Sequence, residues 1–320
     1  MRLFPRLLAL LVLALLAAAP AAQAKSKLVP VTGKLAAKVG IADQKSEVFG
    51  DQRFRGMGIR IARRSVAWDT MQYDWQVADV DAWLQSARAA GVTPLITFAR
   101  SRIDSRRHMV PSAAQVGRAF KAFRKRWPWV TQFVASNESN HYGEPTGRRP
   151  KLAAQWYKAM RRACPTCKIA AATLLDYPNL VTWTKQFVKA AKEQPRYWAL
   201  HNYISANRFQ TARTKQFLQA TRGEVWITEV GGAVKRPKGQ ARFSEGATHA
   251  AKVTRFIFGD LARLSKRITR VYLYHWNAAA GPTTWDSALV AADGTPRPAL
   301  GVVQQVLKGV KIKPLRGARR

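Results

Sequence analysis

The stretch that decides the fold is Val134-Ala135-Ser136-Asn137-Glu138-Ser139-Asn140-His141. It continues an apolar run, residues 130–135, which has the length of a buried strand and turns polar around Glu138. The pattern recurs where Val225-Trp226-Ile227-Thr228 leads to Glu229 and then to Val230-Gly231-Gly232. A carboxylate directly after a buried strand is costly unless it is used or paired. Two strand-like runs therefore each deliver one glutamate at the point where the strand gives way to a loop.

Strand-like and helix-like segments alternate along the rest of the chain. Apolar runs predict eight strands, at 38–43, 58–66, 93–98, 130–135, 168–173, 197–201, 224–228 and 268–275. Helical spacing predicts helices at 77–90, 113–127, 151–163, 180–192, 211–220, 246–264 and 299–307. Such alternation favours a parallel sheet covered by helices, and eight units in fewer than about 300 residues fit an α/β fold of the (β/α)8 TIM-barrel type. An open doubly wound sheet is the alternative, weakened because no glycine-rich phosphate loop follows the first strand.

The N-terminus has the three-part pattern of a secretory signal. A basic segment precedes an apolar run at 7–19, and Ala22-Gln23-Ala24 predicts cleavage before Lys25. We expect residues 1–24 to be the signal, 25–36 a linker, 37–310 the barrel and 311–320 a basic tail. The apolar run is short for a permanent anchor, which is the alternative, and no later run is long enough to span a membrane. The sequence thus predicts a secreted or cell-envelope protein without a membrane span after signal removal.

The only cysteines are Cys164 and Cys167, separated by Pro165-Thr166. A second cysteine pair is absent from the sequence, so a four-thiolate zinc site is excluded. A redox pair is the alternative in a reducing compartment. For an exported protein we expect a structural disulfide that closes the turn before the strand at 168–173.

The chain is strongly basic, with 54 lysine and arginine residues against 18 aspartate and glutamate residues and a net charge of +36. Such a charge attracts polyanions, including acidic polysaccharides and anionic cell-wall polymers. Basic residues cluster at Arg148-Arg149, at Lys235-Arg236 and at 311–320, but no nucleic-acid-binding motif accompanies them, so no specific nucleic acid partner is expected. A solvated cationic surface without a specific partner explains the same counts.

Functional side chains of a (β/α)8 barrel collect at the C-terminal ends of its strands. Those ends supply carboxylates, aromatic rings and hydrogen-bonding groups: Arg63, Trp68, Asn137, Glu138, Asn140, His201, Tyr203, Glu229 and Trp276. Aromatic faces stack on sugar rings, amides and imidazoles bind hydroxyls, and paired carboxylates cleave glycosidic bonds. Taken singly, Glu138 could cap a helix, His201 could be a packed core histidine and Trp276 could plug the barrel. Together the strand ends predict a carbohydrate cleft around Glu138 and Glu229.

The order and strand numbers of these motifs resemble the clan A glycoside hydrolases, which are retaining (β/α)8 glycosidases. That family has Asn-Glu at the end of the fourth strand and Glu at the end of the seventh, as Asn137-Glu138 and Glu229 stand here. The resemblance implies that Glu138 is the acid/base, that Glu229 is the nucleophile and that Asn137 holds the sugar 2-hydroxyl. It implies no metal and no organic cofactor. We expect Glu138 to be protonated by its apolar surroundings and its negative neighbour.

Other strand ends extend the resemblance. His201 and Tyr203 match a His-x-Tyr motif of the sixth strand, whose tyrosine orients the nucleophile. Trp276 matches the aromatic residue of the eighth strand that floors the sugar subsite. Arg63 matches an arginine of the second strand that supports the nucleophile, and Arg64 is the alternative.

The chain departs from the family motif Trp-Asn-Glu-Pro-Asn, because Ser136 and Ser139 replace the tryptophan and the proline. The Asn-Glu pair survives, so we expect a glycosidase that hydrolyses a poly- or oligosaccharide. Two alternatives remain. One is a carbohydrate-binding barrel without efficient catalysis, and the other is a polyanion-binding structural protein of the cell envelope.

Overall fold

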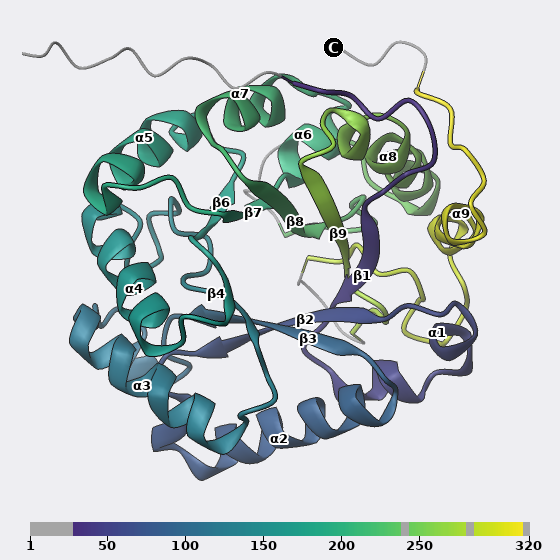
Figure 1. Cartoon of the computed structure of the whole chain (residues 1–320). Coiled ribbons are helices and arrows are strands. Elements are labelled where there is room, and N and C mark those ends of the chain that lie inside the picture. Colours follow the sequence, from purple (N-terminus) through teal and green to yellow (C-terminus); the bar gives the residue numbers. More distant parts are fainter. Residues whose placement is uncertain (1–27, 238–242, 280–284, 316–320) are drawn as a thin grey trace, which may run out of the picture.

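The computed structural model describes residues 28–237, 243–279 and 285–315. Parallel strands wind into one barrel, and helices surround it (Figure 1). The strands are β1 (Lys38–Ala42), β2 (Ile61–Ala67), β3 (Thr93–Ala99), β4 (Gln132–Val134), β5 (Lys168–Ala170), β6 (Thr173–Leu175), β7 (Tyr197–His201), β8 (Glu224–Val230) and β9 (Ile268–Tyr274). In the sheet they follow the order β5-β4-β3-β2-β1-β9-β8-β7-β6. The predicted TIM barrel is confirmed.

The structure has nine strands where the sequence predicts eight, because the predicted fifth strand is interrupted. Ala171 and Ala172 separate β5 from β6, and both are buried. The N–H of Ala171 donates to the carbonyl of Tyr197, and the carbonyl of Ala172 accepts from Ala199. These bonds to β7 close the barrel at the interruption. β5 and β6 thus occupy the place of one strand.

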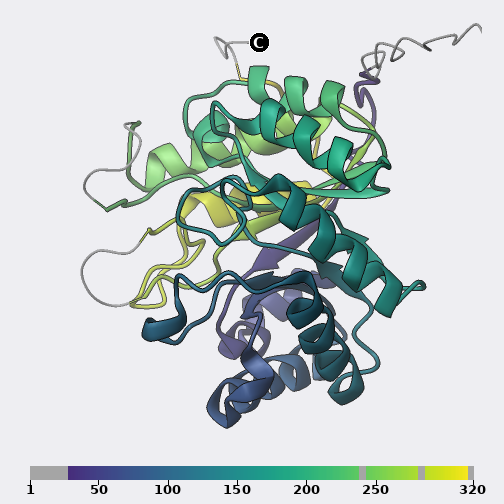
Figure 2. The same ribbon diagram turned by 90° about the vertical axis from the view of Figure 1, so that its left-hand side faces the viewer.

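The helices lie outside the barrel, and Figure 2 shows them from the side of α3, α4 and α5. They are α1 (Gln52–Gly56), α2 (Asp74–Ala89), α3 (Ala113–Arg126), α4 (Pro150–Ala163), α5 (Leu180–Ala191), α6 (Tyr203–Asn207), α7 (Ala212–Ala220), α8 (Ala247–Gly259) and α9 (Pro298–Leu307). The short helices α1 and α6 were not predicted. The predicted helix at 246–264 ends at Gly259, and a 3-10 turn, Leu261–Arg263, follows it. Ser112 caps α3 in a capping box with Gln115.

Alternation along β2 settles which arginine enters the barrel. Successive side chains of a strand point to opposite faces. Ile61 belongs to the cluster of buried residues inside the barrel, whereas Ala62 packs in the layer beneath the helices. Arg63 therefore points inward and Arg64 outward, where Arg64 pairs with Asp79 of α2.

Both terminal segments that the structure describes pack against the barrel. The N–H of Val31 donates to the carbonyl of Arg263, and Ile312 is buried. The N–H of Leu315 donates to Asp260 beyond α8. The described part of the expected linker, from residue 28, and the start of the expected basic tail therefore make contacts with the barrel domain. The predicted signal, 1–24, lies outside the described residues, and within the described ranges no helix is long and apolar enough to cross a membrane.

Candidate active site

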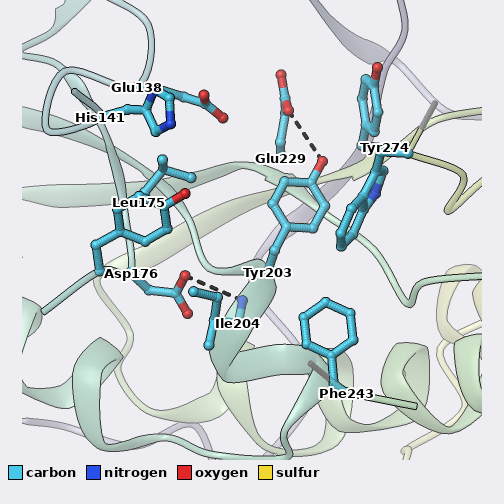
Figure 3. Close-up of a pocket in the computed structure, with 11 residues that line it drawn as sticks. Glu138, His141, Leu175, Asp176, Tyr203, Ile204, Glu229, Phe243 and Tyr274 are labelled. Carbon is cyan, nitrogen blue, oxygen red and sulfur yellow. Dashed lines mark hydrogen bonds between the residues drawn. The ribbon is translucent and has the colours of Figure 1, made fainter. Parts of the chain in front are cut away.

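A cavity of about 530 Å³ opens at the C-terminal ends of the strands. It is lined by Glu138, His141, Leu175, Asp176, Tyr177, Tyr203, Ile204, Glu229, Phe243, Tyr274 and Trp285. Both glutamates point into the same space (Figure 3). The two strand-end carboxylates singled out from the sequence therefore meet in one cavity.

The backbone around Glu138 is fixed on both sides. The N–H of Asn137 donates to the carbonyl of Phe98 on β3, and the N–H of Ser139 donates to that of Thr173 on β6. Glu138 itself has a φ of +38°, a conformation that costs free energy in a residue other than glycine. Because its neighbours are held by two strands, the turn directs the Glu138 side chain into the cavity.

The two departures from the family motif lie beneath this turn. The hydroxyls of Ser136 and Ser139 are hydrogen-bonded to each other, and both side chains are buried. Neither serine lines the cavity. The pair replaces a tryptophan and a proline by a hydrogen bond that closes the Glu138 turn from below.

Glu229 stands near the end of β8, where the register with β7 and β9 shifts. One carboxylate oxygen is paired with the guanidinium of Arg63. The other accepts a hydrogen bond of 3.2 Å from the hydroxyl of Tyr203. A carboxylate with both oxygens so bound is fixed in position, as a nucleophile requires.

Arg63 connects three strands and the loop after β4 beneath the cavity. Its side chain is fully buried, its Nε donates to Thr97 Oγ1 at 2.9 Å, and a terminal nitrogen donates to Asn137 Oδ1 at 2.7 Å. Burial lowers the pKa of Arg63 to about 10, so the guanidinium stays charged at neutral pH. Asn137 is half-buried, Arg63 holds its side-chain oxygen, and the residue lies beside the cavity without lining it, so its predicted contact with a sugar stays a prediction.

His201, predicted to bind substrate, instead lies beneath the two glutamates. It is fully buried, and its Nδ1 is 3.2 Å from Glu138 Oε1 and 3.6 Å from Glu229 Oε2. Burial lowers the pKa of His201 to about 4, so the ring is neutral near pH 7. A neutral imidazole facing two carboxylates carries its proton on the nitrogen nearest to them. His201 therefore donates to Glu138 and fixes its position.

This hydrogen bond corrects the expected protonation of Glu138. Burial disfavours the charged carboxylate, but the hydrogen bond from His201 and the positive charge of Arg63 together hold the pKa of Glu138 below its ordinary value. Glu138 is therefore ionised at neutral pH in the free protein. The apolar surroundings inferred from the sequence do raise the pKa of Glu138, but the buried histidine and Arg63 together lower it by more.

A third carboxylate, Glu144, lies in the loop after Glu138. Its side chain is buried, and Arg100 is 3.9 Å away. Burial raises the pKa of Glu144 to about 7, and the charge of Glu138 adds to that rise. Glu144 does not line the cavity, so we assign it to the support of the loop.

The structure does not bring the other predicted sugar contacts into the cavity. Trp276 is fully buried, its indole nitrogen donates to Asp51, and it packs edge-on against Phe54. Trp68 is also buried and lies under Arg106 in a separate depression beside α3. The structure therefore places neither ring in the cavity that holds the two glutamates.

Asn140 does not line the cavity either. Its amide donates to the carbonyl of Leu175 at 2.9 Å and to Asn179, while its oxygen accepts from the N–H of Leu175. The side chain is buried, and these bonds join the loop after β4 to the end of β6 and to the residue before α5. Asn140 therefore shapes the cavity wall without contacting a ligand.

Three aromatic rings that line the cavity, Tyr274, Trp285 and Phe243, were not predicted from the sequence. Trp285 contacts the ring of Tyr203 at 5.0 Å and that of Phe243 at 5.9 Å, and Tyr274 stands at the end of β9. Strand alternation could have found Tyr274, because Tyr272, two residues earlier, belongs to the barrel interior. Phe243 and Trp285 stand outside the helices and strands, where no periodicity applies.

Glu138, His201 and Glu229 are also the described residues whose grouping could hold a metal ion, because their donor atoms lie within 4.8 Å of one another. A cation there would compete with the Arg63 guanidinium for Glu229 and would displace the proton that His201 shares with Glu138. The donor atoms of these three residues are thus already engaged with one another and with Arg63, and no step of the reaction proposed below uses a metal.

Cys164 and Cys167 are joined by a disulfide between the end of α4 and the start of β5. Strand β5 begins at that end of the barrel, so the disulfide lies at the opposite end from the cavity. Its position is that of a structural link.

The comparisons with known proteins agree with this geometry. Residues 109–302, more than half of the chain, match the family model of the glycosyl hydrolase catalytic core. A comparison with curated protein sequences found no match.

Solved structures share the fold at low sequence identity. A glucosidase from Croceicoccus marinus has a TM-score of 0.64 at 15% identity, over 88% of this chain and 68% of that one. A GH39 β-xylosidase from Caulobacter crescentus has a TM-score of 0.58 at 14% identity, over 88% and 72%. A family 39 glycoside hydrolase from Bacteroides cellulosilyticus WH2 has a TM-score of 0.57 at 15% identity, over 86% of this chain and 64% of that enzyme, so the chain spans less than two thirds of its length.

The solved structures confirm the expected barrel fold, and the expected enzyme class, a glycoside hydrolase, is that of the matching family. The matched range contains both cavity glutamates. The chain belongs to the glycosyl hydrolase catalytic core family.

Proposed function

We propose that this protein is a retaining O-glycosidase in which Glu229 is the nucleophile and Glu138 the acid/base. The spacing of the two carboxylates carries the proposal, since an oxygen of each lies within 4.8 Å of the other. Retaining enzymes hold their carboxyl groups about 5–5.5 Å apart, whereas inverting enzymes leave about 6.5–9.5 Å for a water molecule. The pairing of Glu229 with Arg63 and Tyr203 assigns the nucleophile, because those contacts favour the ionised, immobile carboxylate.

In the first step, an oxygen of Glu229 forms a bond to the anomeric carbon as the bond to the leaving oxygen breaks. Protonated Glu138 gives its proton to that oxygen, which departs as an alcohol. The products are the released alcohol and a glycosyl ester of Glu229. Since the pKa of Glu138 is depressed in the free protein, this step depends on the fraction of Glu138 that is protonated at the working pH.

In the second step, ionised Glu138 takes a proton from water, and the water oxygen attacks the anomeric carbon. The ester bond to Glu229 breaks, which restores its carboxylate and leaves Glu138 protonated. His201 steadies Glu138 through both steps by donating to its charged form. Two displacements at the same carbon give net retention of configuration.

The lining of the cavity supports a neutral sugar in its reactive subsite. The described lining residues comprise aromatic rings, aliphatic side chains, a histidine and carboxylates, and none of them is a lysine or arginine. Arg63 lies below, engaged with Glu229 and Asn137. A uronic acid would place its carboxylate against Glu138, Glu229 or Asp176 and be repelled. We therefore propose a neutral residue of a poly- or oligosaccharide as the group that is cleaved.

We also propose that the enzyme acts outside the cytoplasm, as a secreted or cell-envelope protein. The signal-like pattern at 1–24 and the disulfide between Cys164 and Cys167 support this location, because disulfides persist in oxidising compartments.

The stereochemistry of the product tests the mechanism. The first substrates to assay are aryl β-glucosides and aryl β-xylosides, because a glucosidase and a β-xylosidase are among the structural neighbours. An aryl β-glucuronide is the charged control. Proton NMR of the first product should show retained configuration, and a 2-deoxy-2-fluoro glycoside should label the peptide that carries Glu229. An inverted product, or a label on another residue, would overturn the assignment.

A further inference from the structure

The helices around the barrel differ sharply in charge. α2 carries Asp74, Asp79 and Asp81 against Arg88. By contrast, every charged side chain of α3, α4 and α5 is a lysine or an arginine. Helices α1, α7 and α8 also carry only basic charges, two each, so the adjacent helices α3, α4 and α5, with eleven lysines and arginines in all, form the largest basic group among the described helices.

These three helices are neighbours on the outside of the barrel, and Figure 2 looks onto them directly. We call their exposed lysines and arginines the cationic wall. Arg118 and Lys121 of α3 and Arg162 of α4 line a groove of about 370 Å³ between the two helices, over a floor of alanines and Gly117. All three side chains are exposed, and within the described ranges none of them pairs with a carboxylate.

The wall and the cavity face different directions. The cavity opens at the C-terminal ends of the strands, whereas the wall runs along the side of the barrel. The groove shares no residue with the cavity. A polymer on the wall therefore leaves the cavity free, and the carboxylates of the cavity repel an anionic chain from it.

We propose that the cationic wall binds a carboxylated polysaccharide and thereby holds the protein on an acidic glycan matrix while the cavity acts on a neutral sugar. Packed helices lie about 8–10 Å apart, so three of them present charge over a span that suits a polymer rather than a single small anion. The aromatic side chains of α3, α4 and α5 are buried, so the wall offers no stacking surface for nucleic acid bases. A guanidinium matches a carboxylate in geometry, which favours the acidic glycan.

A matched pair of triple variants tests the proposal. The wall variant is Arg118→Gln, Lys121→Gln and Arg162→Gln. The control is Lys252→Gln, Arg255→Gln and Lys308→Gln, which removes the same charge from exposed positions on α8 and just after α9, on the other side of the barrel (Figure 1). The affinity of each protein for polygalacturonate is measured over a salt series, with a neutral β-glucan and duplex DNA as alternative ligands.

The wild type should bind polygalacturonate at about 0.1 M salt and should not bind the neutral glucan. The wall variant should lose about tenfold or more in affinity, and the slope of log affinity against log salt should fall by about 2, because cation–polyanion contacts are lost. The control should change less than about threefold, a small charge effect of the kind expected away from the contact surface.

Equal losses in both variants would show that net charge alone binds the polymer, and no binding by the wild type would also overturn the proposal. Tighter binding of DNA than of polygalacturonate, lost in the wall variant, would show that the polymer class is wrong. Hydrolysis of an aryl glycoside should be the same in all three proteins. This readout separates the wall from the proposed catalytic function, so either one can fail alone.

Discussion

The cavity and the cationic wall are two regions of one barrel with opposite chemistry. The cavity gathers Glu138, Glu229 and Asp176 among aromatic rings, whereas the wall carries only positive charge. In the cavity, each charge is fixed by a buried partner. On the wall, the charges are exposed to water, and the ion pair of Arg126 with Asp81 of α2 is itself exposed, so each contact is weak and the number of charges decides the binding. The net charge of the chain therefore says nothing about the site.

Removal of the nucleophile should separate the two regions most strongly. Glu229→Ala should lower kcat on an aryl glycoside by about 10⁴-fold or more, because the covalent step loses its reacting atom. Binding to polygalacturonate should not change. Steady-state kinetics and the same binding assay measure both effects.

Glu138→Ala is the control within the cavity. A good leaving group needs no proton, so the variant should keep formation of the glycosyl ester on activated aryl glycosides and fail on unactivated oligosaccharides. Near-wild-type turnover by Glu229→Ala on either substrate would contradict the proposed roles.

The Tyr203 hydroxyl tests how the cavity positions its nucleophile. Tyr203→Phe removes the 3.2 Å hydrogen bond to Glu229 and keeps the ring that packs against Trp285. We expect kcat to fall by about 10- to 100-fold with little change in Tm, a loss typical of one positioned donor. Tyr177→Phe is the matched control, because Tyr177 lines the same cavity without a hydrogen bond to Glu229. If both variants lose the same activity, the hydroxyl of Tyr203 has no special role.

The pH profile tests the link between His201 and Glu138. The pKa of Glu138 is lowered, so the protonated acid is lost as pH rises through a value below its ordinary one, and kcat/KM on unactivated substrates should be highest at acidic pH. His201→Phe removes the donor that stabilises ionised Glu138, so the pKa should rise and the descending limb should move to higher pH.

Two comparisons sharpen this pH prediction. His201→Gln restores a donor and should move the limb back toward its wild-type position. With an activated leaving group, the first step needs no acid, so the rate of formation of the glycosyl ester should not fall along the descending limb that Glu138 sets for unactivated substrates. A descending limb that stays in place in His201→Phe would show that His201 does not set the protonation of Glu138.

The sequence was sufficient for the barrel and for the pair of glutamates, because strand alternation and strand ends are local patterns. It also favoured Arg63 over Arg64 correctly, because side chains alternate along β2 and Arg63 is on the face that points into the barrel. Trp276 shows the limit of this reasoning. It follows β9, but beyond the last strand residue the alternation no longer determines direction, and the ring turns toward Asp51 and Phe54 instead of the cavity.

What could not be predicted depends on contacts between distant segments. His201 is 63 residues from Glu138 in sequence, and its effect on the pKa of that carboxyl appears only when the strands are assembled. The same holds for Trp285, which reaches the cavity from a loop. Composition could not predict the cationic wall either, because a total charge does not reveal that α2 is acidic while α3, α4 and α5 are basic.

The smallest effect on the chemistry should come from the disulfide. Cys164 and Cys167 enclose a very short loop after α4, at the end of the barrel opposite the cavity. Loop-closure entropy for so short a loop gives about 2 kcal/mol of stability, so the free energy of unfolding of the double variant Cys164→Ser and Cys167→Ser should fall by that amount, measured as a lower midpoint of urea unfolding. Its kcat should stay at the wild-type value, since the strands that carry Glu138, His201 and Glu229 are held by their own hydrogen bonds. A marked loss of kcat under folded conditions would show that the end of α4 and the cavity are coupled, and the two regions could then no longer be treated as independent.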